Sequence, residues 1–196
     1  MFGLLKDKET YSKIILCSLP LTVVATTAYT SILVAVISFL AVIISTLLVC
    51  LLKSFLTEKT ALLAKVIISL GVVGVLTMTA SVFYKELTDS VSPYLPLISL
   101  TTVLILSGKD TIEATPANAL KASVVMGGVS SGFLFVVGIL REFLGMGSLF
   151  GIDIYTKVFA PMELFKNPVG ALFIAAMLVL LYNILVSLTG KRGTKE

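Results

Sequence analysis

The sequence contains no histidine and little charge, and these two absences remove several classes of protein. Without histidine, the chain cannot build histidine-ligated haem, histidine zinc sites or catalytic triads that use histidine as the base. Charged residues make up 13% of the sequence, whereas soluble domains average about 25%. Hydrophobic residues make up 57%, which is typical of a protein embedded in a lipid bilayer. The net charge of +4 predicts no nucleic-acid partner, because the charges form short clusters between apolar runs.

Cysteine is also scarce, and the common catalytic and cofactor-binding motifs are missing. Cys17 and Cys50 both lie in apolar surroundings, so no disulfide framework is expected. Two cysteines cannot supply the four ligands of an iron–sulfur cluster, so any cluster would have to be shared with another subunit. The sequence has no phosphate-binding glycine loop, dinucleotide fingerprint or metalloprotease motif, and no acidic residue in the middle of an apolar run. We therefore expect a subunit that depends on partners for activity.

Uncharged runs predict the transmembrane helices. Residues 14–52 contain no ionisable side chain except Cys and Tyr, and this run is about twice the roughly 20 residues that one helical crossing needs. Two spans separated by a turn at residues 26–31 fit this run. Each of the other uncharged runs is long enough for one crossing, and they cover residues 66–84, 90–108, 122–140 and 167–190. The sequence thus predicts an all-α integral membrane protein with six transmembrane helices in a single membrane domain over residues 1–196.

The distribution of lysine and arginine predicts the orientation of these spans. With six spans, eleven basic residues fall on the side of the two termini and four on the other side. This bias places both termini in the cytoplasm. The longest loop, from Arg141 to Lys166, then faces outward. It contains Gly145, Gly147, Gly151 and Pro161, which favour a segment that folds back or lies on the surface.

Two short matches suggest an internal repeat. The segment Leu19-Pro20-Leu21 recurs at residues 95–97, and the pattern at residues 52–56 recurs at residues 140–144. Three spans per half force the halves into opposite orientations, so we predict two inverted three-helix repeats at about 14–84 and 90–190. Pro20 and Pro96 each remove a backbone donor at matching places, which predicts that helices 1 and 4 are discontinuous. Proline kinks that serve only packing remain the alternative.

The segment Arg141-Glu142-Phe143-Leu144-Gly145-Met146-Gly147-Ser148-Leu149-Phe150-Gly151 resembles the end of the fifth helix in the Rnf/Nqr membrane subunits. The resemblance is greatest to the E-subunit branch of the Rnf complexes and the D-subunit branch of the sodium-pumping NADH:quinone reductases. It implies transmembrane electron transfer coupled to Na⁺ or H⁺ movement in a prokaryotic cytoplasmic (inner) membrane. It also implies a homologous sister subunit of opposite topology, together with flavoprotein and ferredoxin-like subunits.

The resemblance further implies a [2Fe–2S] cluster held by two cysteines from each sister subunit. Cys17, in Leu16-Cys17-Ser18, matches the family cysteine of the first helix, and it is the candidate cofactor-binding and metal-ligating residue. The second family cysteine follows a Pro-Leu-Ile in the fourth helix, and Thr102 stands at that position here. A threonine hydroxyl is a poor iron ligand beside a thiolate. Cys50 is no replacement, because it lies near the cytoplasmic end of the second span.

Two other classes of function fit the size and topology. One is the substrate-binding six-helix subunit of a small-solute, vitamin-type importer, and the other is a membrane assembly or scaffold protein. The motif at residues 141–151 and the placement of Cys17 favour a subunit of a redox translocase. The sequence leaves open the ion, the electron donor and the subunit stoichiometry.

Overall fold

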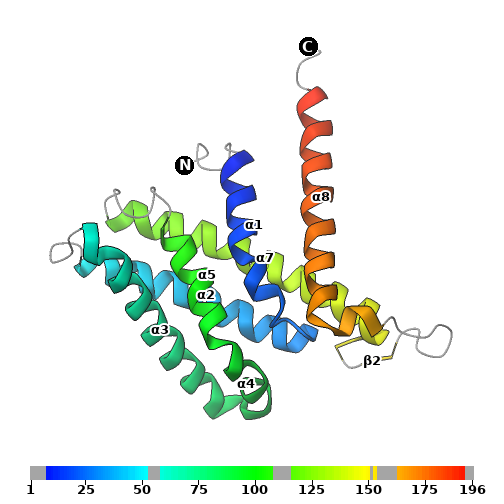
Figure 1. The fold of residues 1–196 in the computed structure, drawn as a ribbon, viewed down its shortest axis with the longest axis horizontal. Coiled ribbons are helices and arrows are strands. Elements are labelled where there is room, and N and C mark those ends of the chain that lie inside the picture. Colours follow the sequence, from blue (N-terminus) through cyan, green and yellow to red (C-terminus); the bar gives the residue numbers. More distant parts are fainter. Residues whose placement is uncertain (1–7, 53–57, 108–115, 151, 154–162, 193–196) are drawn as a thin grey trace.

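A computed structural model describes residues 8–52, 58–107, 116–150, 152–153 and 163–192 (Figure 1). Helices form almost all of this part of the chain, which confirms the all-α architecture. A two-residue antiparallel hairpin pairs Ser148 with Asp153 and Leu149 with Ile152. The elements in chain order are α1 (Lys8–Thr22), α2 (Ala28–Leu52), α3 (Glu58–Phe83), α4 (Lys85–Val91), η2 (Ser92–Tyr94), α5 (Leu95–Leu106), α7 (Pro116–Met146), β1 (Ser148–Leu149), β2 (Ile152–Asp153), η3 (Glu163–Lys166) and α8 (Pro168–Arg192).

Four helical segments in the described residues are long and apolar enough to cross a bilayer. They are Ala28–Leu52, Thr60–Phe83, Lys85–Leu106 and Ala117–Met146. These segments coincide with the second, third, fourth and fifth spans that the uncharged runs predict. Helix α1 has only 15 residues, and the described apolar part of α8, Pro168–Ile184, is a shorter apolar helix.

The first predicted span ends early. Helix α1 passes through Pro20 and stops at Thr22, and residues 23–27 form a non-helical connection to α2. The predicted turn at residues 26–31 is therefore only partly right, because Ala28 to Ser31 already form the first turn of α2. Pro20 has no N–H to donate to the carbonyl four residues earlier, which weakens the helix at this point, and α1 ends two residues later.

The fourth predicted span contains a change of helix type rather than a gap. The α-helical turn of α4 gives way to the 3₁₀ turn η2 at Ser92, and α5 begins at Leu95, with Pro96 in its first turn. Two backbone hydrogen bonds link the segments across this change. The Ser92 N–H donates to Thr88, and the Leu95 N–H donates to Ser92.

Helices α2 and α7 form the most extensive contact and run antiparallel at the centre of the molecule. Small side chains set their spacing. Ser31 lies against Gly138, the Ser131 hydroxyl donates to the Ala35 carbonyl at 3.0 Å, and the Ser123 hydroxyl donates to that of Thr46 at 2.8 Å. The remaining helices pack around this pair, with α1 and α5 against both each other and the central helices. In Figure 1, the start of α1 and the end of α8 both point to the top of the view.

The end of α7 corrects the predicted outer loop. The sequence suggests that the fifth span ends at Arg141, whereas α7 continues to Met146. Arg141 and Glu142 lie inside this helix and are both about 2% exposed. They are therefore buried side chains rather than loop charges. Gly151 and Pro161 lie outside the described residues.

Candidate functional site

Arg141 links two segments that are not α-helical, the connection 23–27 and the 3₁₀ turn η3, to the end of α7. Its Nη1 donates to the carbonyls of Val23 and Ala25, each at 3.0 Å, in the connection between α1 and α2. Its Nε donates to Phe165 at 3.0 Å, and its Nη2 donates to Lys166 at 2.9 Å, both in η3. Guanidinium offers five donors in a fixed plane, so one side chain can satisfy several carbonyls that have left a helix. Non-helical backbone inside a membrane domain requires partners of this kind.

Glu142 holds the start of α2. The Ala28 backbone N–H donates to its Oε2 at 2.5 Å. The first N–H groups of a helix have no partner in their own helix and carry the positive end of its dipole, so a carboxylate at this place satisfies both needs. Arg141 and Glu142 therefore bind opposite sides of the connection: the arginine donates to its carbonyls, and the glutamate accepts from the Ala28 N–H at the start of α2.

The sequence around Thr27 supplies a second cap for the same helix. The Thr27 N–H donates to the Thr30 hydroxyl at 2.9 Å, and the Thr30 N–H donates to the Thr27 hydroxyl at 3.2 Å. This reciprocal pair has the geometry of a capping box, with threonine in the place usually held by glutamate. The Ser31 hydroxyl donates to the Thr27 carbonyl at 2.6 Å. Local sequence thus fixes where α2 begins.

Glycines allow the segments to approach this closely. A side-chain carbon at Gly138 would overlap Ser31, and one at Gly170 would overlap the backbone of η3 at Leu164 and Phe165. A side-chain carbon at Gly145 would lie 3.2 Å from the Phe165 carbonyl carbon. A larger residue at Gly138 would push α2 away from α7, and one at Gly170 would push η3 away from α8. Either change would disturb the Arg141 hydrogen bonds.

The rest of the motif turns the chain back over the start of α2. Gly147 has φ 68° and Phe150 has φ 54°, both in the left-handed region. The Phe150 ring meets the Tyr29 ring edge to face at a centroid distance of 5.4 Å. The Tyr29 hydroxyl also donates to the Phe150 carbonyl at 3.3 Å. The predicted folding back of this segment is therefore confirmed for residues 147–150 and 152–153. We call the motif together with residues 23–31 and η3 the Arg–Glu node.

The structure brings Cys17 and the C-terminal half of α5 into one apolar cluster. Cys17 is half-buried on α1, and it packs with a group of side chains from α1, α2, α5 and α7 that includes Ile14, Val42, Ile105, Leu106 and Met126. Thr102 lies one turn before Ile105 and Leu106 and is fully buried. Its hydroxyl donates to the Ile98 carbonyl at 2.9 Å, as helical threonines commonly do.

The donor set at this place does not fit an iron–sulfur cluster with two thiolates from this chain. Cys17 is a free thiol, and Thr102 supplies a hydroxyl that is engaged with its own helix. Among the described residues, no group of three or more His, Cys, Asp or Glu side chains could hold a metal. The surroundings of Cys17 are hydrocarbon. The cysteine–threonine pair that the resemblance singles out thus supplies one thiol instead of two.

Sequence reasoning missed two sets of residues. Arg141 and Glu142 entered only as part of a motif, and Arg141 was counted among the four outer cations. The signal was present, because an adjacent pair of opposite charges directly continues an apolar run. The second set consists of four buried seryl hydroxyls that have no hydrogen-bond partner in the described structure, namely Ser38, Ser45, Ser69 and Ser130. Such groups are usually satisfied by buried water.

The fold and the node define a polytopic α-helical membrane protein in which two adjacent buried charged side chains hold the connection between α1 and α2. The chain belongs to the Rnf-Nqr family of membrane subunits, whose description, "Rnf-Nqr subunit, membrane protein", matches residues 3–185. A relative is the E-subunit of the Na(+)-translocating ferredoxin:NAD(+) oxidoreductase complex of Acetobacterium woodii. It is 22% identical over 182 residues, which cover 92% of each chain. The family resemblance of the motif at residues 141–151 is thereby confirmed.

Proposed function

We propose that the chain is the E-type membrane subunit of an ion-translocating complex that passes electrons from reduced ferredoxin to NAD⁺. The observation that carries the proposal is the Arg–Glu node. The segment with the family resemblance forms the node that fixes the end of α1 and the starts of α2 and α8. The match to the E-subunit of the Acetobacterium woodii complex over 92% of both chains supports the same assignment. Family membership also favours this function over an importer subunit.

The proposal includes six spans in two inverted halves, at about 14–84 and 90–190, with α1 and α8 as the first and last. The packing of the helices supports it. If α1, α2 and α3 correspond to α5, α7 and α8, then α2·α7 and α1·α5 are contacts on the pseudo-two-fold axis. The contacts α1·α7, α1·α8 and α2·α3 then correspond to α2·α5, α3·α5 and α7·α8, and all of these contacts occur.

Reporter fusions test this topology. With six spans and cytoplasmic termini, a reporter inserted at Lys59 should lie in the cytoplasm, and one at Lys157 should lie on the outer side. Fusions at the two sites that report the same side would refute the six-span arrangement. Such a result would also contradict at least one of the spans Thr60–Phe83, Lys85–Leu106 and Ala117–Met146, because all three lie between the two sites.

The proposed partners are a homologous sister subunit of opposite topology and the flavoprotein and ferredoxin-like subunits, in a prokaryotic cytoplasmic membrane. An affinity tag on the full chain should isolate these subunits together. Membrane vesicles from a strain that lacks the chain should lose both ferredoxin-dependent NAD⁺ reduction and the accompanying Na⁺ uptake. Isolation with a pair of ATPase subunits instead, or unchanged ferredoxin-dependent activity, would refute the proposal.

The proposed role does not depend on a cluster ligated by this chain, because the residues at Cys17 and Thr102 do not fit one. We expect Cys17→Ser to leave the iron content and the paramagnetic signal of the purified complex unchanged. Iron analysis and low-temperature electron paramagnetic resonance measure both. A loss of iron in Cys17→Ser would establish the thiol as a ligand to a cluster that other subunits complete. Thr102→Cys, which restores the second family thiol, should then raise iron occupancy.

A further inference from the structure

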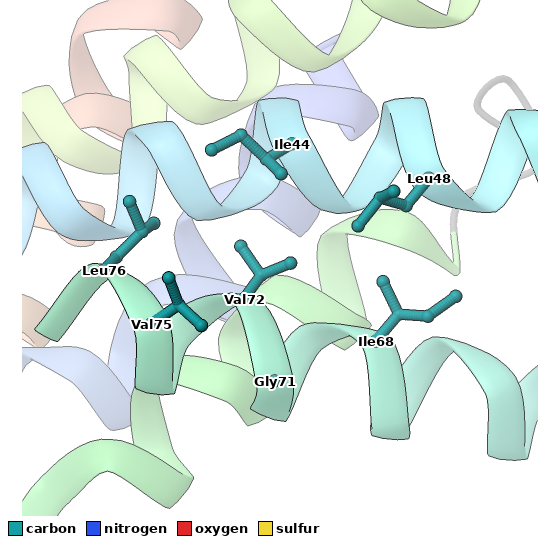
Figure 2. Close-up of a pocket in the computed structure, with 7 residues that line it drawn as sticks. All are labelled: Ile44, Leu48, Ile68, Gly71, Val72, Val75 and Leu76. Carbon is teal, nitrogen blue, oxygen red and sulfur yellow. The ribbon is translucent and has the colours of Figure 1, made fainter. Parts of the chain in front are cut away.

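Helix α2 presents two kinds of surface to its neighbours. Toward α3 it presents hydrocarbon, and Figure 2 shows Ile44 and Leu48 on α2 facing Ile68 and Val72 on α3. Toward α7 it presents hydroxyl groups as well. The buried stripe of α2 on this side follows the spacing of one helix face and contains Ser31, Ala35, Ser38, Val42 and Ser45. The serines of α2 therefore gather where the two central helices meet.

The antiparallel register of α2 and α7 places Ser38 beside Ser130. The contacts that fix the register at this level are those of Ala35 with Ser131 and of Val42 with Gly127. Ser38 lies between the two α2 positions, and Ser130 lies between the two α7 positions. Each serine is also close to the middle of its helix, which is Ala28–Leu52 or Pro116–Met146. The pair therefore lies at one level of the contact, deep within the bilayer.

The hydroxyls of this pair have no hydrogen-bond partner in the described structure. Ser38 is 1% exposed, and Ser130 is 0% exposed. The hydroxyls of Thr46 and Ser123, on the same two helices, donate to a carbonyl one turn earlier in their own helix. Ser38 and Ser130 make no such bond, so both hydroxyls are available to a ligand between the helices. A buried hydroxyl without a hydrogen bond is costly, and the bilayer core supplies no solvent water.

A ligand at this level must be small and neutral. The helices pack closely at Ala35 and Gly127, three residues before the two serines, which restricts the space to a molecule of a few atoms. A cation would need a counter-charge, yet α2 contains no charged residue and α7 contains none from 122 to 140. Water meets both conditions, because it is neutral and can both donate to and accept from a hydroxyl.

We propose that Ser38 and Ser130 together bind one water molecule between the centres of α2 and α7. Each hydroxyl makes one hydrogen bond to the water, so the water joins the two central helices where their serines do not bond each other. The site rests on the α2–α7 contact alone and does not depend on the proposed electron-transfer role.

A double-mutant cycle tests whether the two serines share a ligand. Ser38→Ala and Ser130→Ala are made singly and together in the full chain, and thermal unfolding is measured in detergent. Each single change should lower the midpoint by about 2–4 °C, because the water and the remaining hydroxyl each lose a partner. The double variant should fall no further than either single variant, because both changes remove the same bridge.

The control cycle pairs Ser130→Ala with Ser45→Ala. Ser45 is fully buried, its hydroxyl also has no partner in the described structure, and it lies two turns along α2 from Ser38. It is therefore too far along the helix to share a water with Ser130. The effects of Ser45→Ala and Ser130→Ala should add.

Radiolytic labelling detects the water itself. X-ray pulses convert bound water into hydroxyl radicals that oxidise adjacent side chains, and mass spectrometry locates the products. Met126, one turn before Ser130, should be oxidised although it is only 7% exposed. Met177, which is 59% exposed in an apolar stretch of α8, is the control and should stay unoxidised in a lipid nanodisc. Oxidation of Met126 should fall to the Met177 level in the double variant Ser38→Ala with Ser130→Ala.

Three outcomes would overturn the proposal. Additive losses in the cycle of Ser38 and Ser130 would show that the two hydroxyls share no ligand. Oxidation of Met126 that persists in the double variant would place the water elsewhere. A coupled cycle without oxidation of Met126 would show that the two hydroxyls bond each other directly.

Discussion

The two interruptions of α-helical structure, one after α1 and one between α4 and α5, are held by different means. After α1, residues 23–27 leave helical geometry, and their carbonyls bind Arg141 from a helix more than 100 residues away. Between α4 and α5, the backbone only tightens into the 3₁₀ turn η2 and keeps its own bonds. At the first break, backbone carbonyls leave the helix and accept hydrogen bonds from a side chain of another helix. At the second break, backbone groups of residues 88–95 bond to one another. The need for a buried charge pair follows from how many backbone groups an interruption frees.

Removal of Arg141 should produce the largest loss of stability. Arg141→Ala leaves the carbonyls of Val23, Ala25, Phe165 and Lys166 without these donors inside the protein. Breaking a buried charged network of this kind costs about 3–5 kcal/mol. Thermal unfolding of the purified chain in detergent should show a matching fall in midpoint. Lys85→Ala, at an exposed position at the start of α4, is the matched control and should change stability by less than about 0.5 kcal/mol.

Arg141→Lys sharpens this test, because it keeps the charge and removes the planar fork of donors. It should recover only a small part of the lost stability. Full recovery would show that charge alone matters at this position, and that the multiple carbonyl bonds do not.

Gly138→Ala should give the second largest effect, because its new methyl group would overlap Ser31 at the start of α2. Overpacking of this type costs about 1–3 kcal/mol. Gly132→Ala, on the same helix with no atom within 4 Å of the added carbon, should be neutral or slightly stabilising. The double variant Gly138→Ala with Ser31→Gly should recover most of the loss in thermal unfolding. Equal unfolding midpoints for Gly138→Ala and Gly132→Ala would contradict the packing at the first break.

Glu142→Gln should have an intermediate effect of about 1 kcal/mol. The amide oxygen can still accept from Ala28, but the negative charge at the start of α2 is lost. Glu142→Ala removes both and should cost more. Chemical unfolding of the two variants separates charge from hydrogen bonding. If Glu142→Gln matches Glu142→Ala, the charge carries the whole interaction.

Pro93→Ala, in the 3₁₀ turn of the second break, should give the smallest effect. Pro93 is exposed, and the backbone bonds of η2 do not use its side chain. The change should alter stability by about 0.5 kcal/mol, through the freedom of the unfolded chain. Thermal unfolding measures this shift against Gly138→Ala. A loss above about 2 kcal/mol would mean that the second break also depends on contacts from outside its own segment.

The sequence by itself determined which stretches are long and apolar enough to form membrane helices, because hydropathy is a local property. Uncharged runs predicted four spans found in the structure, and Thr27 and Thr30 form a cap within one turn. Tertiary structure alone decided that Arg141 is buried and that Thr102 offers no free ligand. It also decided that Glu142 reaches Ala28, 114 residues away. Hydropathy and capping depend on neighbouring residues, whereas the partner of a buried charge depends on which distant segments the packed helices bring together.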